Sequence, residues 1–395
     1  MSINIISDLA DKAFDGQRVF MRVDFNVPLD GSKITDDARI VAALPTIKHA
    51  LERGASLILA SHLGRPKGKA NPALSLEPAA ARLSELLRRD VILPDDCVGD
   101  GVRKLASELE PGQVMLLENL RFHKEEKKND PEFAAQLAAL ADTYVNDAFG
   151  TSHRAHASVV GVAGRFAHAR RAAGFLIQRE LEFLGSALEE PKRPFVAVLG
   201  GAKVSDKIGV IRALLKKADA ILVGGAMAYT LMKAQGKTVG KSLVEDERLE
   251  EARKILELVS TSRAALLLPS DHGVAESFDS AEITYTKFIG SDVAGFDIGP
   301  ETVAAFSKRI ANAGTVFWNG PMGVFEKAPM AVGTMSVAKA LAQSKAVSIV
   351  GGGDSAAAIR VAGLRDEIDH VSTGGGASLE FVEGQELPAI AALRG

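Results

Sequence analysis

The stretch ASLILASHLGRPKGK (55–69) decides the fold class. It opens with an apolar run of strand length, and a basic loop with two glycines and a proline follows at once. Similar apolar runs recur along the chain, for example RVFMRVD (18–24), TYVND (143–147) and FVAVLGG (195–201), with helix-like stretches between them. Buried β-branched runs that alternate with amphipathic helices predict parallel sheets covered by helices on both faces.

The length and composition predict two lobes in one soluble chain. The 395 residues are too many for one ordinary core, 47% are apolar and 25% are charged. The net charge of −3 gives no global basic field that would argue for nucleic acid, and no apolar run is long enough for a membrane span. The single cysteine, Cys97, fits a reducing compartment, and the N-terminus lacks a signal-peptide core. We therefore expect a cytoplasmic protein.

A long helix divides the predicted lobes. FLIQRELEFLGSALEE (175–190) reads as one helix that ends before Pro191. We expect an N-terminal lobe over 1–174, an interdomain helix over 175–190 and a C-terminal lobe over 191–387. Both lobes should be Rossmann-like, with a hinge at the ends of the helix.

Basic groups follow several strands of the first half. The loops DFNVP (24–28), SHLGRP (61–66), ENLRFH (118–123) and NDAFGTSHRAH (146–156) lie where ligands bind in an open α/β sheet. They carry Arg65, Arg121, Arg154, His62, His123, His153 and His156. A single arginine at a strand end is usually a solvated surface residue, but four such loops in one sheet favour an anion site. Since arginine suits phosphate, we expect a small phosphorylated ligand.

Glycines follow the strands of the second half. GGAKVSDK (200–207), GGA (224–226), GGGDS (351–355) and TGGGAS (373–378) would let backbone N–H groups approach phosphates. Tight strand–helix turns also need glycine, and neither common nucleotide fingerprint is intact. Lys203, Lys207 and Asp354 within these loops favour a nucleotide. Asp354 could hold Mg²⁺ or cap a helix just before Ser355.

WNGPMGVFE (318–326) holds the only tryptophan of the chain. Packing is the expected role of Trp318 and Phe325. Asn319 and Glu326 are candidates to bind phosphate and ribose hydroxyls.

These motifs together resemble the phosphoglycerate kinase family. The resemblance also covers DDARI (36–40), GGAKVSDKI (200–208) and GFDIGP (295–300), in the order of the family and from end to end of the chain. It implies transfer of the acyl phosphate of 1,3-bisphosphoglycerate to MgADP, giving 3-phosphoglycerate and MgATP. It also implies a monomer with the phosphoglycerate on the N-terminal lobe, the nucleotide on the C-terminal lobe, and residues from about 388 to 395 packed back on the first lobe.

The resemblance assigns roles position by position. For the phosphoglycerate it implies Asp24, Phe25, Asn26, Arg39, His62, Leu63, Gly64, Arg65, Arg121 and Arg154. For the nucleotide it implies Lys207, Glu326, Gly352, Gly353, Asp354 and Ser355, with Asp354 as the Mg²⁺ ligand, and Asn319 joins them as the candidate from its own motif. Arg39, Lys203 and the backbone of Gly374, Gly375 and Gly376 would serve the phosphoryl group in transit. Phosphoryl transfer needs positioning and charge neutralisation, which these groups supply.

Two other functions compete with this one. A catalytically silent phosphoglycerate-binding scaffold should have lost Arg39, Lys203 or Asp354, and all three are present. An NAD-dependent dehydrogenase should show G-x-G-x-x-G after its first strand, and that motif is absent. His123, His153 and His156 receive no role.

Overall fold

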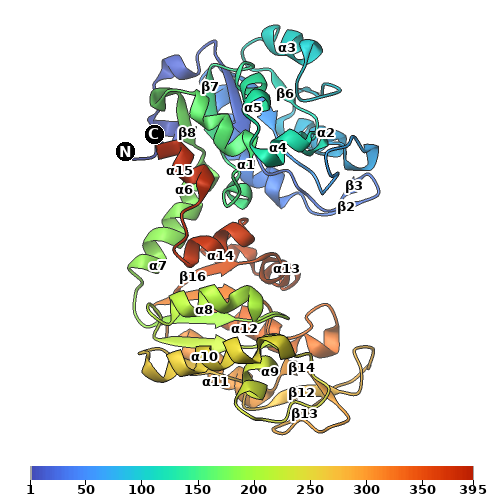
Figure 1. Cartoon of the computed structure of the whole chain (residues 1–395), viewed down its shortest axis with the longest axis vertical. Coiled ribbons are helices and arrows are strands. Elements are labelled where there is room, and N and C mark those ends of the chain that lie inside the picture. Colours follow the sequence, from blue (N-terminus) through green and yellow to red (C-terminus); the bar gives the residue numbers. More distant parts are fainter. Residues whose placement is uncertain (1, 395) are drawn as a thin grey trace. The chain divides into compact units, whose positions relative to one another are not determined.

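A computed structural model describes residues 2–394, and the chain divides into two compact units. Unit 1 comprises Met1–Leu181 together with Glu386–Gly395, and unit 2 comprises Glu182–Gln385. Each unit has a six-stranded sheet with helices packed against it (Figure 1). The hydrogen-bonded strand pairs of both sheets are parallel, so the predicted α/β class is confirmed.

The sheet of unit 1 has the strand order β5-β6-β4-β1-β7-β8. Its strands are β1 (Arg18–Arg22), β4 (Ser56–Ala60), β5 (Val91–Ile92), β6 (Val114–Leu116), β7 (Thr143–Asn146) and β8 (Arg171–Ala173). The helices of the unit are α1 (Ala38–Glu52), α2 (Glu77–Leu87), α3 (Asp100–Ser107), α4 (Lys124–Lys128), α5 (Pro131–Ala138), α6 (Phe175–Leu181) and α15 (Pro388–Arg394). All five residues of β4 are buried, as a strand covered on both faces requires. A short antiparallel pair, β2 (Leu29–Asp30) and β3 (Lys33–Ile34), precedes α1.

Three strands of this sheet end at the same level. Arg22, the last residue of β1, pairs in register with Ala60 of β4 and with Asn146 of β7. The loops that follow these strands therefore open side by side at one edge of the sheet, where an open α/β sheet binds its ligands.

The C-terminal helix α15 belongs to unit 1. It packs against β8 and against residues 157–165, and the backbone N–H of Ala389 donates to the carbonyl of Ser152 over 3.1 Å. Figure 1 shows this red helix beside the green strand β8.

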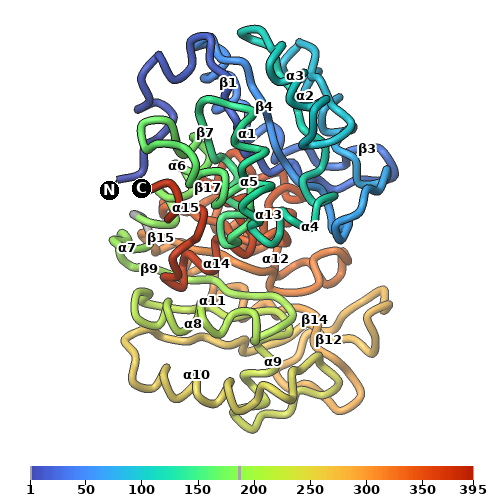
Figure 2. Tube along the Cα trace, turned by 45° about the horizontal axis from the view of Figure 1, so that its top comes forward, coloured from blue at the N-terminus to red at the C-terminus, as the bar shows by residue number. Residues whose placement is uncertain are grey.

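The sheet of unit 2 has the strand order β11-β10-β9-β15-β16-β17. Its strands are β9 (Phe195–Leu199), β10 (Ala220–Val223), β11 (Ala265–Leu267), β15 (Thr315–Asn319), β16 (Val347–Gly351) and β17 (His370–Val371). The helices are α8 (Ile208–Leu214), α9 (Gly225–Ala234), α10 (Leu249–Thr261), α11 (Pro300–Ala311), α12 (Val332–Ala342), α13 (Gly353–Val361) and α14 (Gly376–Val382). Figure 2 shows α10 running past α8 and α9, against which it packs. Asn319 pairs in register with Leu199 and Gly351, so the loops after β9, β15 and β16 also share one edge.

Unit 2 also contains an antiparallel sheet that the sequence did not indicate. It has the order β13-β12-β14, formed by β12 (His272–Ala275), β13 (Thr284–Thr286) and β14 (Ala294–Ile298). Their sequences, HGVA, TYT and AGFDI, are interrupted by glycine and polar residues, and β13 is mostly exposed. They therefore lack the continuous apolar runs that indicate strands of a parallel sheet.

The helix predicted over 175–190 is helical as far as Glu189, but it is not uniform. The α-helix α6 ends at Leu181, a π-helical stretch occupies Glu182–Ser186, and α7 (Ala187–Glu189) closes the segment. The boundary between the two units falls between α6 and the π-helical stretch. Within residues 2–394, no helix is both long enough and apolar enough to span a bilayer.

Candidate functional site

The first group of predicted residues gathers at the carboxyl ends of β1 and β4. Arg39, in the first turn of α1, donates from Nη1 to Oδ2 of Asp24 over 3.2 Å and to the carbonyl of Asn26 over 3.0 Å. The Oδ1 atom of Asn26 accepts from the N–H of Gly64 over 2.9 Å. One hydrogen-bonded cluster thus joins the loop after β1, the loop after β4 and α1.

A basic cavity of about 640 Å³ opens beside this cluster. Three of the predicted arginines, Arg65, Arg121 and Arg154, line its wall. The wall also carries Lys67, Gly68, His123, Lys124, Lys127, Lys128 and His156. A concave wall that collects this much positive charge attracts anions.

Arg121 has donors to spare in the wall of this cavity. Its Nη1 atom donates to the carbonyl of Gly64 over 2.8 Å, whereas its buried Nε and Nη2 atoms have no hydrogen-bond partner within residues 2–394. Burial, together with the positive charges of Arg154 and Arg22, lowers the pKa of Arg121 to about 10. A bound anion would satisfy the donors and offset the repulsion among the arginines.

His62 is buried and neutral. Burial, followed by the charges of Arg22 and Arg121, lowers its pKa well below the ordinary value. Because an arginine can only donate, the 3.1 Å contact from Nη2 of Arg22 makes Nδ1 of His62 an acceptor and leaves the ring proton on Nε2. His62 therefore offers a hydrogen-bond donor and no charge.

Arg22 and Glu126 are buried charged residues of unit 1 that no sequence motif indicated. Arg22 donates from Nε to Oγ of Ser158 over 2.8 Å, and that hydroxyl donates to Oε1 of Glu126 over 2.6 Å. Arg22 ends an apolar strand and Glu126 lies within the charge run KEEKK (124–128), a pattern that ordinarily indicates a solvated helix. Glu126 can be recognised only from its burial, and nothing in the sequence indicates that burial.

Two residues that are predicted to contact the substrate have their side chains in the protein core. Phe25 and Leu63 belong to the hydrophobic core of unit 1. The N–H of Phe25 donates to Oγ of Ser61, and both backbone polar groups of Leu63 bond to the amide of Asn119. These two residues hold the loops in place, and their role as substrate contacts stays a prediction.

A second cavity, of about 490 Å³, lies at the carboxyl edge of the sheet in unit 2. Predicted residues form much of its wall: Lys203, Lys207, Asn319, Gly352, Gly353, Asp354, Ser355, Gly375 and Gly376. The remaining wall consists of Gly200, Gly201, Ala202, Asp206, Gly320, Pro321 and Leu379. The glycine loops after β9, β15 and β16 thus meet at one place, as the common end of these strands requires.

Lys207 and Asn319 are bonded to each other in this wall. The Nζ atom of Lys207 donates to Oδ1 of Asn319, and the buried Nδ2 atom of Asn319 has no partner in the part of the chain that the structure describes. Burial lowers the pKa of Lys207 to about 8, although the carboxylates of Asp206 and Asp354 act in the opposite direction. The positive charge of the Lys207 ammonium is therefore poorly compensated by the protein, and phosphate oxygens would stabilise it.

Helix α13 begins at this cavity. Its N-cap is Gly352, which has a φ angle of +91°, a conformation that side chains other than glycine rarely adopt. Asp354 lies in the first turn, so the alternative prediction that Asp354 caps the helix is wrong. Its exposed carboxylate shares the cavity wall with Asp206. One or two carboxylates, completed by phosphate oxygens and water, are ligands that suit Mg²⁺.

Two predicted residues do not line the second cavity. Glu326 is exposed and absent from the wall, and Gly374 is buried and donates its N–H to Oγ of Ser372 over 3.1 Å. Helix α14 starts at Gly376, and of the three glycines of this loop only Gly375 and Gly376 line the cavity. Trp318 and Phe325 pack in or against the core of unit 2, as expected.

Comparison with known proteins gives one consistent result. Residues 9–385 match the family model described as phosphoglycerate kinase. The chain is 62% identical over 383 residues to a phosphoglycerate kinase of Anaeromyxobacter dehalogenans, which covers 95% of this chain and 96% of the relative. The phosphoglycerate kinase of Chloroherpeton thalassium is 57% identical, with coverage of 97% and 98%.

Solved structures agree with these relatives. A phosphoglycerate kinase from Coxiella burnetii matches with a TM-score of 0.87 at 44% identity, over 99% of both chains. That of Pyrococcus horikoshii matches with a TM-score of 0.88 at 35% identity, over 99% of this chain and 98% of the other.

Proposed function

The chain belongs to the phosphoglycerate kinase family, and from this membership we infer how its two polar cavities share one reaction. The chain is an enzyme of glycolysis that reversibly transfers the acyl phosphate of 1,3-bisphosphoglycerate to ADP, giving 3-phosphoglycerate and ATP. The silent scaffold and the dehydrogenase find no support in these relatives.

The basic cavity of unit 1 is proposed to bind the phosphoglycerate. Arg65, Arg121 and Arg154 would hold the phosphate that is not transferred, and the unpartnered donors of buried Arg121 are the single observation that supports this most strongly. His62 would add its Nε2–H, and Asp24 and Asn26 would bind the glycerate hydroxyl and carboxyl groups. In this arrangement Gly64 shapes the loop through its bond to Asn26.

The glycine-lined cavity of unit 2 is proposed to bind the nucleotide. Lys207, Asn319 and the backbone of Gly352, Gly353 and Ser355 would contact the phosphates, and Glu326 would reach the ribose from outside the cavity wall. Asp354 would hold Mg²⁺, which when bound supplies positive charge to the nucleotide phosphates. The exposed carboxylate of Asp354 in the cavity wall supports this role.

The transfer step itself is proposed to depend on positively charged and backbone donors. Arg39 and Lys203 would neutralise charge on the phosphoryl group as it passes, and the N–H groups of Gly375 and Gly376, with Gly374 behind them, would meet its oxygens. Arg39 is already held by Asp24, so the geometry of its guanidinium is fixed before the substrate arrives. A preorganised donor of this kind lowers the barrier without a covalent nucleophile.

Transfer also requires the two substrates to come together. Reacting atoms must lie about 3–3.5 Å apart, with water excluded. We propose that the chain bends at the segment 175–190, and that closure is favoured only when both ligands are bound. The π-helical stretch Glu182–Ser186, a common site of helix bending, supports this segment as the hinge. Small-angle scattering should show a smaller radius of gyration with both ligands than with neither or either one, whereas equal values in all four states would exclude the hinge.

The cellular setting is proposed from sequence features and family. A reducing cytoplasm fits the single cysteine, and a monomer is the form that the family resemblance implies. Sedimentation velocity of the full chain tests the second proposal, because a dimer would sediment as a species of twice the mass.

A coupled assay tests the reaction. The full chain, supplied with ADP, Mg²⁺ and 1,3-bisphosphoglycerate, should form ATP, and omission of either substrate should abolish the signal. A scaffold would bind 3-phosphoglycerate without forming ATP. A dehydrogenase would instead change the absorbance of added NADH in the absence of ADP.

A further inference from the structure

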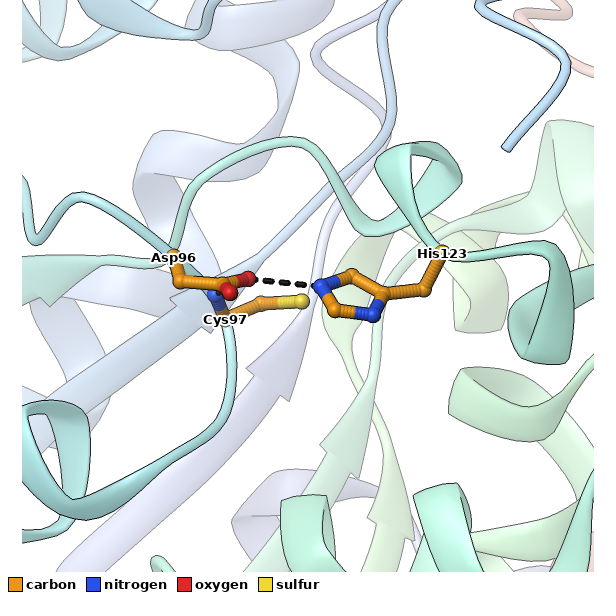
Figure 3. Close-up of side chains that lie close together, drawn as sticks. All are labelled: Asp96, Cys97 and His123. Atoms are coloured by element: carbon orange, nitrogen blue, oxygen red, sulfur yellow. Dashed lines mark hydrogen bonds and ion pairs between the residues drawn. The ribbon is translucent and has the colours of Figure 1, made fainter. Parts of the chain in front are cut away.

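Three possible metal ligands of different kinds meet in unit 1, at the wall of the basic cavity. They are Asp96, Cys97 and His123, and one ligand atom from each lies within 4.8 Å of the other two. The Nε2 atom of His123 is 2.6 Å from Oδ1 of Asp96. Figure 3 shows the thiol of Cys97 pointing toward the same nitrogen. None of these side chains has a role in the phosphoryl transfer proposed above.

The three side chains are held in place from two segments. Asp96 and Cys97 lie in the loop between β5 and α3, and Oδ1 of Asp96 accepts from the N–H of Cys97 over 2.6 Å. His123 lies directly before α4, and its ring stacks on Phe133 with 5.1 Å between the ring centres. Asp96 is half exposed and His123 is 26% exposed, so an ion could reach the buried thiol from solvent.

A nucleophilic or redox role fits this cluster poorly. A Cys–His–Asp triad needs the imidazole between thiol and carboxylate, one on each nitrogen, whereas here both approach Nε2. Cys97 is the only cysteine, so it has no partner for a disulfide within the chain.

We propose that Asp96, Cys97 and His123 form a site for a zinc-type divalent cation, with water at the fourth position. Thiolate and imidazole ligands favour Zn²⁺ or Co²⁺ over Mg²⁺, which prefers oxygen, so this site differs in kind from that of the nucleotide metal. A tetrahedral zinc ion places its nitrogen and oxygen ligands about 3.4 Å apart. The present hydrogen bond between His123 and Asp96 would therefore open by a modest side-chain movement.

Binding has a simple proton balance. The bond between Sγ and the metal replaces the thiol proton, which leaves to solvent. The proton on Nε2 of His123 either moves to Nδ1 or leaves to solvent, and no electron transfer is needed. The bound cation would tie the loop of Asp96 and Cys97 to the segment that carries Arg121, two residues before His123.

Cobalt is a sharp probe of this site, because the chain has one cysteine. Untagged full-length protein is titrated with Co²⁺ and followed by its absorbance. We expect saturation at one equivalent, a thiolate-to-cobalt charge-transfer band in the near ultraviolet, visible bands of tetrahedral cobalt, and displacement of all of these by Zn²⁺. Since no other thiol exists, that band can come only from Cys97.

Matched variants complete the test. Cys97→Ala should abolish the band, and His123→Gln and Asp96→Asn should weaken Co²⁺ binding at least about tenfold, the scale on which even supporting groups matter at metal sites. The controls His168→Gln and Asp100→Asn should bind as the parent does. The absence of a thiolate band in the folded parent overturns the proposal. Unchanged affinity in both His123→Gln and Asp96→Asn overturns it as well, even if the Cys97 variant does not fold.

Discussion

Arg22 and His62 are both buried, and Nη2 of Arg22 lies 3.1 Å from Nδ1 of His62. The guanidinium fixes the tautomer of the imidazole and helps to keep it uncharged. Burial and nearby arginines likewise lower the pKa of His156 to about 3 and depress that of His153. The positive charge that faces the proposed phosphate site therefore comes from arginine and lysine, with these three histidines neutral.

The first prediction concerns the pH dependence of anion binding. The pKa of His156 is lowered to about 3 and that of His62 well below its ordinary value, so these two imidazoles gain no charge between pH 8 and pH 6. Sulfate, which does not itself titrate in this range, should bind the basic cavity of the variant His123→Gln, which removes the other imidazole of the wall, with the same affinity at both pH values. Competition of sulfate with 3-phosphoglycerate, measured by calorimetry, provides the check. Sulfate affinity that rises severalfold toward pH 6 would show that a histidine in the cavity becomes protonated.

The second prediction concerns Lys207, whose pKa is lowered to about 8. Its ammonium is charged at pH 7 and loses its proton as the pH rises through about 8. ADP affinity should therefore fall between pH 7 and pH 9. The variant Lys207→Arg, which stays charged throughout, should lose most of this decline. If the parent and Lys207→Arg follow the same pH profile in calorimetry, Lys207 is not the group responsible.

The lowered pKa of Lys207 also makes folding stability depend on pH. Because the folded pKa of Lys207 lies below its ordinary value of 10.5, the folded state gives up this proton first, at about pH 8. By linkage, the contribution of Lys207 to the free energy of unfolding should rise from pH 8 to about pH 10.5 and be least favourable below pH 8. Urea unfolding of the parent and Lys207→Met at both ends of this range measures the difference.

The third prediction separates chemistry from binding. Arg39→Ala and Lys203→Ala should each lower kcat by about 10²- to 10³-fold, the scale for loss of one preorganised donor. Steady-state kinetics in the ATP-forming direction give the answer. A normal kcat with only a raised KM in either variant would assign that residue to binding alone.

The fourth prediction concerns the metal of the nucleotide. Asp354→Asn keeps the size of the side chain but removes the charge that would hold Mg²⁺. The Mg²⁺ concentration needed for half-maximal activity should rise, and the corresponding change Asp279→Asn, at an exposed carboxylate bonded to Lys327, should leave it as in the parent. An unaltered Mg²⁺ requirement in Asp354→Asn would exclude Asp354 as the ligand.

The sequence could predict the fold and part of both cavity walls because parallel strands end together. Once ASLILA (55–60) and RVFMR (18–22) are recognised as neighbouring strands, the loops after them must meet, and the register of Arg22 with Ala60 shows that they do. The same reasoning places Lys207, Asn319 and Gly352 at one edge of the second sheet.

What the sequence could not predict depends on burial, on backbone conformation and on contacts that only the fold creates. Glu126 lies in a charge run yet is fully buried. The backbone N–H and the hydroxyl of Ser158 donate hydrogen bonds to its carboxylate and so stabilise it there. The sequence allows Asp354 as an N-cap, but Gly352 is the N-cap in the structure. Its backbone conformation cannot be read from the sequence. Cys97 and His123 are 26 positions apart in the sequence, and only the fold brings their side chains together.

The central claim is that each cavity binds its own substrate, and a crossed calorimetric titration tests it most directly. Arg121→Ala should weaken 3-phosphoglycerate by about 10- to 150-fold, the equivalent of about 1.5–3 kcal/mol for a charged hydrogen bond, and leave ADP binding unchanged. Lys207→Ala should weaken ADP and leave 3-phosphoglycerate unchanged. If Arg121→Ala weakens ADP alone, or Lys207→Ala weakens 3-phosphoglycerate alone, the assignment of the two cavities is wrong.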